Sequence, residues 1–190
     1  MRNPEPTERK RRPPVLQILG LIVGLGLLVT PIVFDLVETW QNNQAITIMT
    51  DTASAQDNEE LQEVLDQARA YNAKLGGKLQ GEAAQAVLPY DEQLVWSADG
   101  AISWLEIPCL NLKLPVYRGT SEETLSSGIG HLGGTSLPVG GESSHCVLTG
   151  HSGMYNSRML DDLRQMKVGD LFAVHTLSEE LVYEVEDISV

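Results

Sequence analysis

An uncharged apolar run near the N-terminus constrains this chain more than any other feature. Residues 13–34 carry no charged side chain, and their core reads VLQILGLIVGLGLLVTPIVF. As a helix, a run of this length extends about 33 Å, which matches the hydrocarbon thickness of a bilayer. A cleaved signal peptide has a shorter apolar region with a small-residue cleavage site close behind it, whereas the A-x-A-like site here, residues 53–55, lies well beyond the run. The run therefore predicts an uncleaved transmembrane signal anchor over residues 13–37 rather than a buried core helix.

Charge is distributed unevenly about this span. Residues 1–12 have a net charge of +3 and the whole chain has −13, so the rest of the chain nets −16. Because a basic segment before a span stays in the cytoplasm, residues 1–12 are predicted to be a cytoplasmic tail. The protein is then a single-pass protein of the cell membrane with an extracellular domain. An acidic body repels phosphate polymers, so nucleic acid is not an expected partner.

Residues 38–98 are predicted to connect the anchor to the main domain. Residues 38–56 are polar without clear periodicity, which indicates a juxtamembrane stalk. An amphipathic helix is expected after them: Asp57 can cap its start, Glu60 stands in capping-box position, and Gly76-Gly77 can end it. The remainder, to residue 98, is a lid-like region whose pattern is ambiguous.

Residues 99–190 have the pattern of a mainly β domain. Strands are expected at 101–107, 110–117, 145–150, 171–176 and 181–190. Short helices are expected at 120–127, with Thr120 and Glu123 in capping-box spacing, and at 157–166; a Gly-rich loop fills 128–144. Short strands separated by long loops predict a mixed β-barrel rather than parallel α/β units.

Several motifs of this domain are similar to those of one known family. The segments LPVYRGT, GHLGGTSLPVGG, TGH-x-G and KVGD follow one another between about Trp104 and Val190. In this order and spacing they resemble the sortases, the cell-surface cysteine transpeptidases of Gram-positive bacteria, and in particular class C, the pilus-assembling type. The resemblance implies a sortase-type β-barrel, an activity in the hydrolase class and no cofactor. It implies LPxTG-type surface proteins or pilin subunits as partners.

The resemblance also assigns a catalytic histidine. In the family a cysteine thiolate attacks the Thr–Gly bond of the sorting signal, a histidine assists proton transfer, and an arginine is the candidate donor to the oxyanion. The matching histidine is His151, which follows Thr149 and Gly150; Gly150 and Gly153 would let the chain turn sharply and present the ring. His131, in GHLGG, is expected either to line the substrate groove or to stabilise its loop.

The family's nucleophile lies in a TLxTC-like strand well after the histidine, with the arginine further on. This sequence ends 39 residues after His151 and contains neither feature. The sequence therefore predicts a C-terminally truncated sortase, with a partial catalytic domain, that is inactive as a transpeptidase by itself. The alternative is a non-catalytic, membrane-anchored module that binds sorting signals or pilins.

The two cysteines do not replace this nucleophile. Cys146 lies about 15 Å from His151 along an extended chain, whereas a working pair needs about 3–4 Å. Cys146 is interpreted as a buried structural thiol, and a disulfide between Cys109 and Cys146 is an alternative outside the cell. The four histidines have no metal-ligand spacing, so no metal site is predicted.

Two departures from the class C pattern concern the surroundings of the site. Class C sortases usually carry a lid with an Asp-Pro-aromatic motif, which residues 76–98 lack; Leu88-Pro89-Tyr90 is not a convincing substitute. The lid is therefore predicted to be absent or altered. Ser152 stands where the family often has arginine, a change expected to affect loop contacts more than chemistry.

Overall fold

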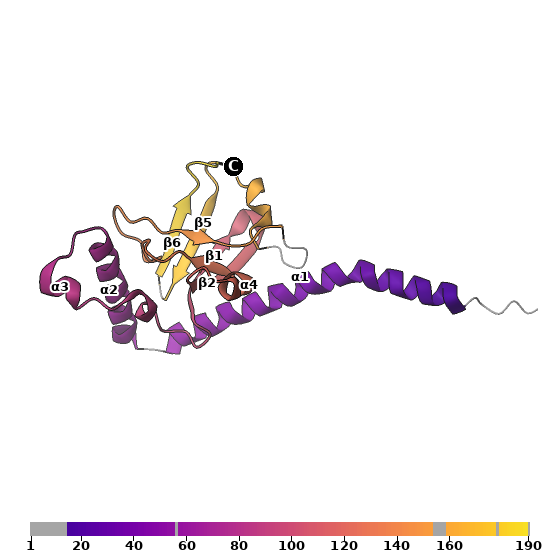
Figure 1. Cartoon of the computed structure of the whole chain (residues 1–190), viewed down its shortest axis with the longest axis horizontal. Coiled ribbons are helices and arrows are strands. Elements are labelled where there is room, and N and C mark those ends of the chain that lie inside the picture. Colours follow the sequence, from indigo (N-terminus) through magenta and orange to yellow (C-terminus); the bar gives the residue numbers. More distant parts are fainter. Residues whose placement is uncertain (1–14, 56, 154–158, 178, 190) are drawn as a thin grey trace, which may run out of the picture.

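The fold is a curled six-stranded sheet that packs against one end of a long helix (Figure 1). A computed structural model of the chain describes residues 15–55, 57–153, 159–177 and 179–189. The helices are α1 (Val15–Ala55), α2 (Asn58–Leu75), α3 (Gly81–Gln85) and α4 (Glu122–Ser127), with 3-10 turns η1 (Tyr90–Glu92), η2 (Pro108–Leu110) and η3 (Asp161–Gln165). The strands are β1 (Ala101–Ile107), β2 (Leu112–Arg118), β3 (Ile129–His131), β4 (Leu148–Thr149), β5 (Leu171–Thr176) and β6 (Glu179–Glu184).

The sheet is mixed, with the strand order β4-β3-β2-β1-β5-β6. Strands β1 and β2 form an antiparallel hairpin through η2, where Asn111 adopts a left-handed φ of 49°. The pair β2–β3 is parallel, and the other neighbours are antiparallel. The expected mixed β architecture is confirmed, in the form of a curled half-barrel.

Strands β3 and β4 differ from the sequence prediction. Strand β3 lies inside the predicted Gly-rich loop, because a three-residue strand is too short to show alternation in sequence. The strand expected over 145–150 shortens to β4. Its earlier residues bond instead to the loop, where Ser136 N donates to His145 O (2.8 Å) and Val147 N donates to Thr135 Oγ1 (3.3 Å).

Other boundaries shift by a few residues. Helix α4 begins later than expected, with Ser121 rather than Thr120 as its cap; the Ser121 hydroxyl accepts the Thr124 amide at 3.2 Å. The helix expected at 157–166 is the single 3-10 turn η3, and residues 154–158 lie outside the described residues. Strand β2 begins after η2, and β6 begins before the predicted 181 and ends before 190.

The core lies on both faces of β1 and β2. Ile102 and Val116 are fully buried, as is Ile129 on β3. Helix α2 adds Leu65 and Ala68, an apolar stripe at helical spacing, to the same buried cluster. Its start is confirmed at the predicted cap, where the Asp57 carboxylate accepts the Glu59 amide at 3.3 Å, and Gly76 ends it.

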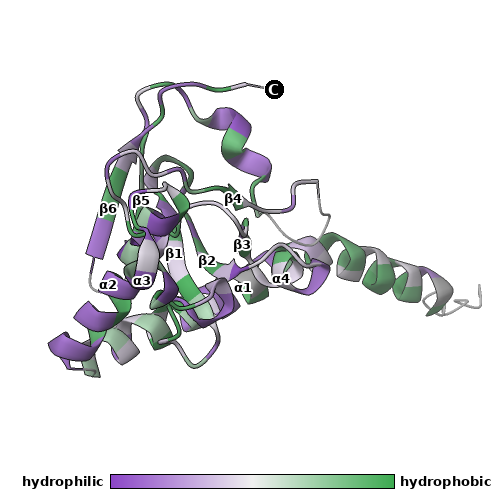
Figure 2. Ribbon diagram, turned by 60° about the vertical axis from the view of Figure 1, so that its left-hand side comes forward, coloured by the Kyte–Doolittle hydropathy of each residue, from purple (hydrophilic) through white to green (hydrophobic). Residues whose placement is uncertain are grey.

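Helix α1 runs without interruption from the apolar N-terminal segment to the domain. The residues assigned to a stalk are helical as far as Ala55, and the helix places Met49, only 1% exposed, in the domain core. Figure 2 shows the apolar N-terminal part of α1 extending away from the sheet. Among the described residues, α1 is the one helix long and apolar enough to cross a membrane.

Candidate active site

His151 lies just after β4, at the edge of the sheet. Thr149 pairs with Gly130 of β3, and the chain then leaves the ladder. A Cβ at Gly150 would approach Ile129 Cδ1 to 2.7 Å, a distance at which something must shift. Gly153 has a φ of +80°, which favours glycine. The two glycines thus let the chain pass close to β3 and turn, which presents the His151 ring beside α4.

The His151 ring is partly exposed and faces one carboxylate. Its side chain retains 30% of its surface, and its Nε2 lies 3.5 Å from Glu122 Oε1 on the first turn of α4. This distance is longer than that of an ordinary hydrogen bond. The Nε2 atom is buried and has no hydrogen-bond partner among the described residues. The Leu160 amide donates to the His151 carbonyl at 3.2 Å and so holds the backbone.

His131 is completely buried, and both nitrogens of its ring have hydrogen-bond partners. Its Nε2 lies 2.9 Å from the carbonyl oxygen of Ser136, and its Nδ1 lies 2.9 Å from the Tyr90 hydroxyl. Since a carbonyl only accepts, Nε2 carries the proton and Nδ1 accepts from Tyr90. Burial lowers the pKa of His131, and the bond to Ser136 opposes this shift. These contacts are of the kind expected for loop stabilisation, and both roles of His131 stay predictions.

Tyr90 ties the lid-like region to this loop, a role that the sequence reading did not assign to it. Besides contacting His131, its hydroxyl accepts the Gly119 amide at 3.0 Å. The Arg118 guanidinium donates to the Gln93 carbonyl at 2.7 Å and holds the same segment from β2. No local signal in the sequence marks this role, because the partners of Tyr90 lie 29 and 41 residues further along the chain.

Both cysteines are free, so the predicted Cys109–Cys146 alternative is wrong. Cys109 is exposed on η2, and Cys146 is half-buried. Burial raises the pKa of the Cys146 thiol to about 12, which is the opposite of what a nucleophile needs. The structural interpretation of Cys146 fits this environment better than a catalytic one.

Cys146 lines an apolar cavity on the inner side of the half-barrel. The cavity has a volume of about 430 Å³ and does not include His151 in its lining. Its walls are mainly aliphatic and aromatic side chains from several strands, η3 and the loops: Leu105, Ile107, Ile129, Leu137, Leu148, Leu160, Leu163, Met166, Phe172, Val174, Tyr183 and Val185. Within the described part of the chain, no group of three histidine, cysteine or acidic residues could hold a metal ion.

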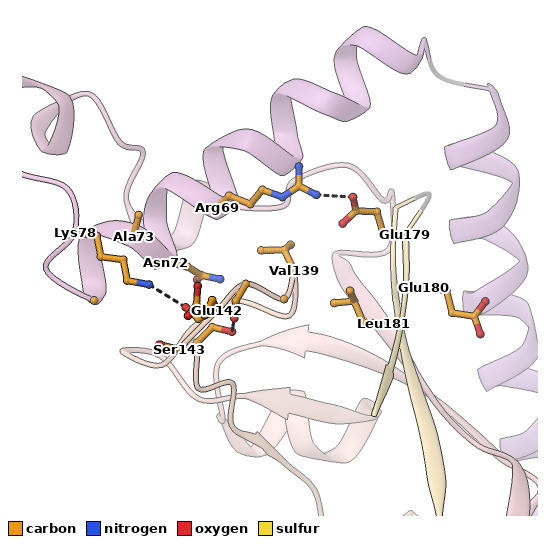
Figure 3. Close-up of a pocket in the computed structure, with 14 residues that line it drawn as sticks. Arg69, Asn72, Ala73, Lys78, Val139, Glu142, Ser143, Glu179, Glu180 and Leu181 are labelled. Atoms are coloured by element: carbon orange, nitrogen blue, oxygen red, sulfur yellow. Dashed lines mark hydrogen bonds and ion pairs between the residues drawn. The ribbon is translucent and has the colours of Figure 1, made fainter. Parts of the chain in front are cut away.

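A second pocket, of about 660 Å³, lies between α2, the loop at 139–144 and β6 (Figure 3). Its polar groups mostly hold these elements together. Arg69 pairs with Glu179 at 2.5 Å, and Lys78 donates to the Glu142 carbonyl at 2.9 Å. Asn72 bonds to both the amide and the carbonyl of Leu137. None of the predicted site residues lies here.

Comparisons with known proteins agree with this geometry. The family model described as the sortase domain matches residues 105–190. Sortase C1 from Streptococcus agalactiae is 35% identical, with a TM-score of 0.68 and 77% of each chain covered. Sortase C from Streptococcus pneumoniae is 35% identical (TM-score 0.62; 78% of this chain and 75% of that chain covered), and sortase C-1 from Actinomyces oris is 38% identical (TM-score 0.59; 69% and 76%). No curated protein matches.

A curled half-barrel with short helices is the fold that this chain shares with the sortases. The chain belongs to the sortase family, and its structural likeness is to the class C pilus sortases. The predicted family and fold class are therefore confirmed. Membership of this family supports an activity of the transpeptidase type.

Proposed function

We propose that this chain is the membrane-anchored, histidine-bearing part of a class C-like sortase. Its substrates are LPxTG-type sorting signals of surface proteins or pilin subunits. The observation that carries the proposal is the position of His151 at the end of β4, in a chain that is 35% identical to sortase C1 over 77% of its length. The similar pneumococcal sortase C structure is described in terms of pilin substrate specificity.

The membrane arrangement is part of this proposal. Residues 13–37, which include the first part of α1, span the cell membrane, residues 1–12 stay in the cytoplasm, and residues 38–98 connect the span to the extracellular catalytic domain at 99–190. Support comes from the length and apolar composition of α1 and from the basic residues before it. Because α1 continues into the domain core at Met49, the domain is held at a set height above the bilayer.

In the proposed reaction a thiolate attacks the Thr–Gly carbonyl, and an acyl-enzyme forms as the amine leaves. His151 favours the thiolate and then protonates the leaving amine, and an arginine donates to the oxyanion. The partial exposure of the His151 ring leaves it within reach of a bound peptide. Gly150 and Gly153 hold the ring at the strand end.

The nucleophile of this reaction is proposed to come from outside residues 1–190. Cys109 is exposed on η2, and Cys146 faces the apolar cavity with its pKa raised, so neither cysteine is suited to the step. In the described sheet, β4 and β6 are edge strands, and the cavity between them is apolar. We therefore expect residues 1–190 alone to be inactive and poorly stable.

The test uses the 190-residue chain in detergent micelles with a fluorogenic LPxTG peptide. We expect no cleavage and no acyl-enzyme by mass spectrometry; cleavage by this chain would overturn the expected inactivity. If the reading frame beyond codon 190 encodes a TLxTC-like strand and a later arginine, the longer protein should form the acyl-enzyme. In it, His151→Ala should abolish turnover, while His145→Ala, at an exposed histidine nearby, should not.

Neither cysteine of the chain is placed to act as a nucleophile, and this favours a second candidate function, binding without catalysis. A sortase-like module without a nucleophile would bind sorting signals or pilins without cutting them. Peptide affinity measured by fluorescence anisotropy separates the two candidates. Binding that persists in His151→Ala, with no acyl-enzyme in any form of the protein, supports the binding module.

A further inference from the structure

The His151 ring has one buried nitrogen that lacks a partner. The exposed part of the side chain lies on other atoms, while Nε2 is buried without a hydrogen bond among the described residues. Leaving a buried polar atom unpaired is costly, so native proteins nearly always supply a partner. The partner has to be a polar group within a short reach of this nitrogen.

Glu122 stands at the required place. Its Oε1 lies 3.5 Å from Nε2, about 0.5 Å longer than an ordinary N–H···O hydrogen bond. Its backbone is held at the start of α4, where the Ser121 hydroxyl accepts the Thr124 amide. Its side chain is 84% exposed, so a small rotation into contact meets little resistance.

The acidic groups of η3 are engaged elsewhere. Asp161 accepts the Gly153 amide, and Asp162 accepts from the Gln165 side chain at 2.7 Å. The Leu160 amide holds the His151 backbone carbonyl and does not touch the ring. Glu122 is therefore the carboxylate with both the position and the freedom to accept a proton from Nε2.

We propose that Glu122 is a positioning residue for His151. Its carboxylate accepts the Nε2–H, and Nδ1 is thereby the nitrogen left to exchange a proton with the reacting groups. The inference rests on the proposed function, because it assigns which nitrogen of His151 acts there. A carboxylate that bonds one ring nitrogen of histidine selects the tautomer and orients the ring. Because the Glu122 carboxylate is exposed, its ion-pair energy with His151 is small, and its effect is to fix the tautomer and the orientation of the ring.

The tautomer can be read directly by NMR. The full chain is labelled with ¹⁵N-histidine in detergent micelles at about pH 8, above the ordinary histidine range. His151→Gln identifies the resonances of His151. We expect the His151 proton on Nε2, and we expect Glu122→Ala to raise its solvent-exchange rate by about three- to tenfold, the factor for one net hydrogen bond. Glu123→Ala, which removes the same charge from the same helical turn, should leave the rate unchanged.

Two results would overturn the assignment: a proton on Nδ1 in the wild-type chain, or equal effects of the Glu122 and Glu123 variants. Matching thermal unfolding of both variants shows that the domain remains folded. The measurement needs no turnover and no peptide. Either of the two NMR results refutes this inference alone and leaves the proposed function untouched. A chain with the Nε2–H···Glu122 bond that never engages the peptide refutes only the proposed function.

Discussion

The hydroxyl of Tyr90 is expected to carry a large part of the stability of the β domain. It joins three segments that are distant in sequence, since it accepts the Gly119 amide at 3.0 Å and donates to His131 Nδ1 at 2.9 Å. The same hydroxyl lies 3.1 Å from the His131 carbonyl oxygen, and Tyr90→Phe keeps the ring while it removes all three contacts. Because His131 is fully buried, no water replaces the lost donor at its Nδ1.

The magnitude follows from the two groups that lose their partner. An unsatisfied buried acceptor at His131 costs about 1–3 kcal/mol, and the half-buried Gly119 amide loses a bond worth about 0.5–1.5 kcal/mol. We therefore expect Tyr90→Phe to lower the free energy of unfolding by about 2–4 kcal/mol. Urea titration of the full chain in micelles, followed by tryptophan fluorescence, measures it, because Trp96 is buried in the domain.

Tyr71→Phe is the matched control. The Tyr71 ring lies 6.1 Å from that of Tyr90, and its hydroxyl makes no hydrogen bond among the described residues. Its loss should change the free energy of unfolding by less than about 0.5 kcal/mol. If the two variants differ by less than this amount, the Tyr90 hydroxyl does not hold the loop and the reasoning fails.

Three further predictions concern pH, thiol reactivity and the docking of α1. Because burial lowers the pKa of His131, the unfolded chain takes up a proton at this residue near pH 6.5 while the folded chain does not. The free energy of unfolding should thus fall as pH drops below about 6.5, by at most about 1.4 kcal/mol per pH unit; the same slope in His131→Gln would contradict this. With the pKa of Cys146 at about 12, only on the order of one thiol in ten thousand is ionised at pH 8, so iodoacetamide should label the exposed Cys109 first. Equal labelling of the two, measured by mass spectrometry, would show that Cys146 is accessible. Met49→Ala should destabilise the domain by about 2–4 kcal/mol in the urea titration, whereas Ile48→Ala, at a neighbour 42% exposed, should have little effect; equal losses would mean that α1 is not docked through Met49.

Local chemistry in the sequence was enough to predict several elements. The run of 22 uncharged residues predicts a helix of membrane-spanning length, and a helix of this length is present. The Asp57 cap and the Gly76 stop bound α2 because they act within one turn of the residue itself. The ordered motifs around His151 indicated the sortase family, which the comparisons confirm.

Elements that depend on partners distant in sequence were not predictable in this way. Strand β3 has only three residues, and its pairing with β2 and β4 defines it. The early residues of the strand predicted at 145–150 do not pair with β3, because they form hydrogen bonds with the loop instead, for example from the Val147 amide to the Thr135 hydroxyl. The path of α1 beyond its apolar part depends on the burial of Met49, which needs the sheet to be present.

The sequence by itself determined that this chain has a long apolar helix, a mainly β domain and a histidine set between glycines at a strand end, because composition and local spacing encode these features. Only the tertiary structure decided the surroundings of its functional groups. It buried His131 against Tyr90, left Cys109 and Cys146 unpaired, and brought Glu122 to the Nε2 of His151. The reason is physical: burial, pairing and the direction of a ring nitrogen depend on residues that meet only when the chain has folded.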